Sequence, residues 1–91
     1  MTEVLQLTTL GGLTIKRGDA KIEGFVSSKV EALLCYLAIN QQVHYRTKLV
    51  GLLWGNMPEA EAKASLRVAL SNLRRLVGEH VIITRQTVAF N

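Results

Sequence analysis

The spacing of apolar residues changes along the chain, from strict alternation at the start to a helical period in the middle. Residues 3–9, 13–16 and 20–25 alternate apolar and polar side chains, with turn-forming residues at Gly11-Gly12 and at Arg17-Gly18-Asp19. Alternation with a period of two is typical of half-buried strands, and glycine with aspartate marks the turns between them. Residues 1–25 therefore predict an antiparallel meander of three strands.

A helical period begins after this meander and predicts the first of three helices over 27–78. From Val30 to about Gln41, apolar side chains recur every three to four residues. Ser27 or Ser28 can cap the start of this helix, with Glu31 spaced as in a capping box. Because its apolar surface extends around much of the cylinder, we expect this helix to be covered from two directions.

Two further helices and a hairpin are expected in the second half. Residues 46–54 predict a helix that ends near Gly55, and Pro58 suits the start of a third helix over 59–77. The inward positions are expected to be Leu49, Val50, Leu52 and Leu53 in the second helix, and Leu66, Leu70, Leu73 and Val77 in the third. A brief extended link is expected at 43–45, and residues 81–91 predict a β-hairpin with a polar tip.

The order of these elements predicts an α+β domain that occupies all of 1–91. Two helices joined by a short glycine-containing link and followed by a hairpin form a helix-turn-helix with a wing. The predicted fold is thus a winged helix with an N-terminal meander (1–25), a three-helix core (27–78) and a wing (81–91).

Composition supports a folded domain, and the charge distribution indicates a polyanionic partner. The chain is 48% hydrophobic and 20% charged, the opposite of a disordered segment. Its net charge of +4 lies entirely in residues 46–91, because residues 1–45 carry equal numbers of basic and acidic side chains. A basic half beside a neutral half favours nucleic acid over a membrane as the partner.

The outward face of the third helix carries donors suited to the major groove of duplex DNA. At 100° per residue the face opposite the core contains Ala64, Val68, Ser71 and Arg75, flanked on one side by Lys63, Arg67 and Arg74 and on the other by Ser65 and Asn72. Asn72 is expected to pair with adenine, Arg75 with guanine, and Val68 to touch a thymine methyl group. Lys63, Arg67 and Arg74 are better placed for phosphates. The alternative is a solvated helix face that is merely basic.

Other residues offer no catalytic or metal-binding pattern. Cys35 lies in an apolar run and is expected to be a buried thiol, while His44 and His80 lack partners at ligand spacing. Gly11-Gly12 precedes a strand, so it is not a phosphate-binding loop. We expect no enzyme activity, no cofactor and no metal. The absence of a signal peptide and of a long apolar run, with the single cysteine, leads us to expect a cytoplasmic location without membrane insertion.

Three stretches together resemble a known family. Leu33–Ala38, Arg46–Trp54 and Ala64–Leu76, with the Leu10-Gly11-Gly12 turn, are similar to the OmpR-type winged helix. The closer similarity is to the branch found in bacterial transcriptional activators of the Streptomyces antibiotic regulatory protein (BTAD-associated) group, and it covers essentially the whole chain.

This resemblance implies double-stranded DNA as the partner and transcriptional regulation as the function. It implies backbone contacts from Arg46 and Lys48 at the start of the second helix and from Trp54, although the residue pattern alone favours core packing for Trp54. It places Ser65, Val68, Asn72 and Arg75 on the recognition helix and Arg85, Gln86 and Thr87 on the wing. Asn72 occupies a position that is often arginine in the family, which puts sequence specificity in doubt more than DNA binding.

The resemblance also implies partners beyond DNA. It leads us to expect that this chain is one domain of a larger regulator. The expected partners are the C-terminal domains of the same polypeptide and RNA polymerase. Whether the domain binds DNA as a homodimer is left open. The alternative from another class is a winged helix used as a protein-interaction module, in which exposed apolar residues such as Val68 would be buried by a partner.

Overall fold

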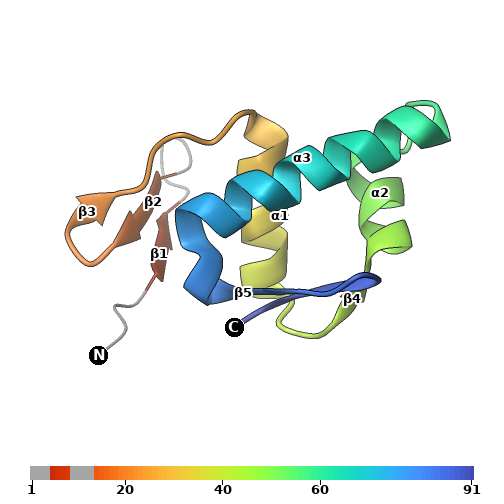
Figure 1. Cartoon of the computed structure of the whole chain (residues 1–91). Coiled ribbons are helices and arrows are strands. Elements are labelled where there is room, and N and C mark those ends of the chain that lie inside the picture. Colours follow the sequence, from red (N-terminus) through yellow and green to blue (C-terminus); the bar gives the residue numbers. More distant parts are fainter. Residues whose placement is uncertain (1–4, 9–13) are drawn as a thin grey trace.

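The computed structural model describes residues 5–8 and 14–91, and within them it contains three α-helices and two three-stranded antiparallel sheets (Figure 1). The predicted α+β class and the predicted order of strands, helices and hairpin are confirmed for this part of the chain. No helix in these two stretches has the length and apolar character needed to cross a membrane.

The N-terminal sheet is the three-stranded meander that the alternating pattern predicts, but its third strand ends at Lys21, short of the predicted residue 25. Strand β1 (Leu5–Thr8) pairs with β2 (Thr14–Arg17), and β2 pairs with β3 (Ala20–Lys21), all antiparallel. Gly18 closes the turn between β2 and β3 with φ of 59°, a conformation that favours glycine. The predicted Gly11-Gly12 turn lies outside the described residues.

Helix α1 (Ser28–Ile39) is the central helix of the core. It buries Val30, Leu33, Leu34 and Leu37, which are spaced three to four residues apart on one face. The helix ends before the expected Gln41: the backbone N–H of Asn40 makes the last bond to the carbonyl of Tyr36 at 2.9 Å, and Asn40 itself leaves the helical conformation with φ of −108° and ψ of 80°. Ser27 occupies the N-cap position, but its side chain makes no capping bond, so the predicted capping box is wrong.

Helices α2 (Arg46–Trp54) and α3 (Glu59–Val77) have the predicted bounds. Helix α3 packs against both α1 and α2, and in Figure 1 it crosses α1 with α2 beside its N-terminal half. The inward stripe of α3 is buried as expected. Leu52 of α2 is 54% exposed, so its predicted inward position is wrong.

The C-terminal sheet joins the expected hairpin to a segment almost forty residues earlier. Strands β5 (Val81–Ile83) and β6 (Thr87–Phe90) form the hairpin, and β4 (His44–Tyr45) pairs with the other edge of β6. The segment expected as an extended link is therefore a strand. A 3₁₀ turn, η1 (Gly78–His80), connects α3 to β5, and Gly78 has a right-handed backbone conformation there with φ of −54°.

Arg17 fixes the C-terminal end of α3 to the N-terminal sheet. Its Nη2 donates to the carbonyl oxygen of Leu76 at 2.9 Å, and its Nε lies 3.0 Å from Oε1 of Glu79. A guanidinium at this position satisfies a free carbonyl and complements the negative end of the helix dipole. Arg17, one of the basic residues in the electrically neutral segment 1–45, thus has a structural role within the fold.

Candidate nucleic-acid interface

Helix α3 presents a basic face to solvent. Four basic residues of this helix are exposed, namely Lys63, Arg67, Arg74 and Arg75, and Ser71 and Val68 are exposed between them. The helical projection placed all six on or beside the outward face, and the structure agrees. The helix is roughly 28 Å long at 1.5 Å per residue, long enough to lie across several base pairs of a groove.

Most of this positive charge is uncommitted. Lys63 Nζ pairs with Oε1 of Glu59 at 3.0 Å, but both side chains are more than half exposed, so the pair contributes little. Among the described residues, Arg67, Arg74 and Arg75 take part in no ion pair. The face therefore offers three free guanidinium groups and one weakly held ammonium to a polyanion.

Asn72 does not belong to this face, and its predicted exposed position there is wrong. It is only 4% exposed, and its side-chain amide is engaged by the segment that leads from β3 to α1. Its Oδ1 accepts the backbone N–H of Val26 at 2.9 Å, and its Nδ2 donates to the carbonyl of Gly24 at 3.1 Å. The projection could not show that a distant segment covers this flank of the helix.

Ser65, on the same flank, is partly covered as well. It is half-buried, and its Oγ lies 3.9 Å from the sulfur of Met57 in the turn before α3. The two residues expected on this flank, Ser65 and Asn72, are thus less accessible than those on the opposite flank. The accessible face is centred on Ser71, with its cations at 63, 67, 74 and 75.

Arg46 holds the hairpin against the first turn of α2. Its backbone N–H donates to the carbonyl of Gln86 at 2.9 Å, and its Nη2 donates to the carbonyl of Thr84 at 2.6 Å. Its Nε is buried without a hydrogen-bond partner among the described residues. Arg46 therefore has a structural role that the sequence did not indicate.

Trp54 and Lys48, the other two residues expected at the DNA backbone, lie apart from Arg46. Trp54 is 5% exposed and belongs to the hydrophobic core, as the residue pattern alone suggested. Lys48 is exposed, but it does not line the space between α2 and α3, whereas Arg46 does. The structure does not bring these three residues to one surface.

The tip of the hairpin is a tight turn with an exposed basic residue. Thr84 Oγ1 accepts the backbone N–H groups of Gln86 and Thr87, at 3.3 and 2.9 Å, which fixes the turn. Arg85 and Gln86 are exposed, while Thr87 is half-buried with its hydroxyl 2.6 Å from that of Thr84. Of the three residues expected on the wing, Arg85 and Gln86 are available to a ligand.

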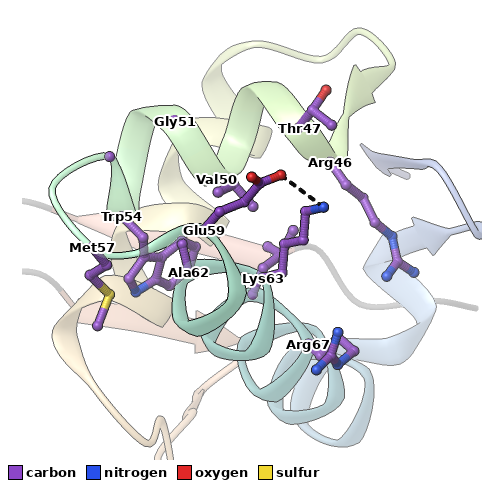
Figure 2. Close-up of a pocket in the computed structure, with 12 residues that line it drawn as sticks. Arg46, Thr47, Val50, Gly51, Trp54, Met57, Glu59, Ala62, Lys63 and Arg67 are labelled. Carbon is purple, nitrogen blue, oxygen red and sulfur yellow. Dashed lines mark ion pairs between the residues drawn. The ribbon is translucent and has the colours of Figure 1, made fainter.

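Between α2 and α3 lies a cleft of about 470 Å³ that the sequence did not predict (Figure 2). We call it the α2–α3 cleft; its lining combines apolar and basic side chains: Arg46, Thr47, Val50, Gly51, Trp54, Gly55, Met57, Glu59, Ala62, Lys63, Leu66 and Arg67. Three of the cations expected at DNA thus share one hollow. Only the packing of the two helices, which a single helical projection does not contain, could show this.

The sequence matches no family model, and no curated protein was found to be similar to it.

Proposed function

We propose that this chain is a winged-helix domain that binds duplex DNA with sequence preference, as part of a transcriptional regulator. Helix α3 would lie in the major groove, and the β5–β6 hairpin would act as the wing beside the backbone or minor groove. The observation that carries the proposal is the exposed face of α3, where Lys63 and three arginines without an ion pair in the described part of the chain surround Ser71. The helix-turn-helix order, with a hairpin after it, supports the same function.

The burial of Asn72 changes how the proposed interface divides between bases and phosphates. Arg75, Ser71 and Val68 are left as base-contacting candidates, of which Arg75 is the one suited to a bidentate contact with guanine. Lys63, Arg67 and Arg74, with Arg46 and Arg85, are suited to phosphates. We therefore propose that phosphate contacts supply most of the affinity and that few positions of the binding sequence are discriminated.

The test is fluorescence anisotropy of the domain on the duplex upstream of its own gene and on a shuffled duplex, at several salt concentrations. Arg75→Ala should reduce the difference in binding free energy between the two duplexes by about 1 to 3 kcal/mol, the cost of one lost base contact. Arg67→Ala should weaken both duplexes alike and flatten the salt dependence by about 0.9 in log–log slope. Lys21→Ala, which removes one exposed charge on β3, is the matched control and should change neither property.

Three outcomes separate the possibilities. A preference that persists as salt rises supports sequence-selective binding. Equal, salt-sensitive binding of both duplexes would leave a non-specific basic surface. No binding at low salt would refute the proposal and favour a protein-interaction module, for which Val68 and Val26, each 58% exposed beside one hollow, are the apolar candidates.

A further inference from the structure

The α2–α3 cleft has two chemically different ends. In the view of Figure 2, Trp54 and Met57 lie at one end, while Arg46 and Arg67 lie at the end nearer the C-terminal strands. Val50, Ala62 and Leu66 add apolar surface to its lining. A molecule that fills the cleft would therefore place an apolar body and a polar head at opposite ends.

The charged residues that line the cleft favour a negatively charged head group. The single carboxylate of the lining, Glu59, is already paired with Lys63. Arg67 is exposed and has no ion pair among the described residues, and Arg46 lines the same cleft. An anion in the cleft would gain charge-assisted hydrogen bonds from Arg67, beside the positive charge of Arg46.

We propose that the α2–α3 cleft binds a small organic anion with an aromatic or aliphatic body. The body would pack against Trp54 and Val50, and a carboxylate or sulfonate would lie between Arg46 and Arg67. The volume of the cleft is within the range of small-molecule sites. Because Arg46, Lys63 and Arg67 are also candidate phosphate contacts, an occupied cleft would compete with DNA; this consequence alone rests on the proposed function.

The site carries its own reporter, because Trp54 is the single tryptophan of the chain. The probe is 8-anilinonaphthalene-1-sulfonate, an aromatic sulfonate that accepts excitation energy from tryptophan. Its uncharged counterpart, N-phenyl-1-naphthylamine, tests the role of the head group. We expect saturable energy transfer from Trp54 to the sulfonate, with an affinity about five- to tenfold higher than that of the neutral probe.

Gly51 offers a position at which a larger side chain is expected to occupy the cleft. It lines the cleft, and a Cβ added to it would meet no atom within 4 Å. Gly51→Leu should abolish saturable energy transfer, whereas Gly51→Ala, the matched control, should leave most of it. Arg67→Gln should lower the affinity for the sulfonate to about that of the neutral probe. Circular dichroism would verify that each variant is folded.

Two results would overturn the proposed site: equal affinity of Gly51→Leu and the parent protein for the sulfonate, or equal affinity of the parent for both probes. These titrations contain no DNA, so they decide the site even if duplex binding fails. In a separate arm, the sulfonate should raise the apparent Kd for duplex DNA with the parent protein and not with Gly51→Leu. An unchanged Kd for the parent at saturating probe would refute the competition.

Discussion

Asn72 gives the sharpest test of the structure, because its burial replaces a predicted DNA contact with a structural role. The substitution is Asn72→Ala. It removes the acceptor for the N–H of Val26 and the donor to the carbonyl of Gly24, and these bonds tie the segment between β3 and α1 to the middle of α3. The residues joined are more than forty positions apart in sequence, so the bonds hold tertiary structure and not a local turn.

The expected cost follows from these two bonds. Each hydrogen bond contributes about 1 kcal/mol net, and a fully buried group left without a partner would cost more. Val26 and Gly24 are exposed residues, so water can reach the freed backbone groups and keeps the cost near the sum of the two bonds. We therefore expect the free energy of unfolding to fall by about 2 kcal/mol, which corresponds to a Tm lower by roughly 10 °C for a domain of this size.

Urea denaturation followed by circular dichroism measures this change, and duplex titration of the same variant tests the alternative. Ser71→Ala, the exposed neighbour, is the control for stability and should shift the midpoint little. At a temperature where Asn72→Ala is folded, its preference among duplexes should equal that of the parent protein. Unchanged stability together with a lost preference for one duplex would refute the reasoning and restore Asn72 as a base contact.

Three further predictions follow from contacts elsewhere. Arg17→Met removes the ion pair with Glu79 and a bond to the end of α3, and should lower the free energy of unfolding by about 1 to 2 kcal/mol in urea titrations. Thr84→Val removes the hydroxyl that accepts two backbone N–H groups, so hydrogen exchange at the hairpin tip should accelerate about fivefold. The Cys35 thiol, expected to be buried, is only partly buried; this partial burial, with a smaller effect of Glu31, raises its pKa above the ordinary 9.0. The unfolded chain therefore loses this proton more readily than the folded chain, so the free energy of unfolding should be constant below pH 9.0 and fall above it. Cys35→Ala should remove this fall when unfolding is measured as a function of pH.

Local patterns in the sequence were sufficient to predict the three helices, the meander and the hairpin in their observed order within the described residues. The period of apolar positions gave the bounds of α2 and α3 and the hairpin, because side-chain spacing follows directly from helix and strand geometry. It also placed the four cations of α3 on an exposed face. These are properties of single elements, so the periodicity of each element is enough to predict them.

The tertiary structure alone decided which residues meet across elements. It buried Asn72 under residues 24–26, engaged Arg46 with the hairpin, and added 44–45 to the C-terminal sheet. It also formed the α2–α3 cleft from two helix faces. Such contacts depend on how packed elements are oriented relative to one another, and the burial of apolar surface that drives this packing is non-directional. Local periodicity therefore shows which side of a helix faces the core, but not which distant segment covers its flank.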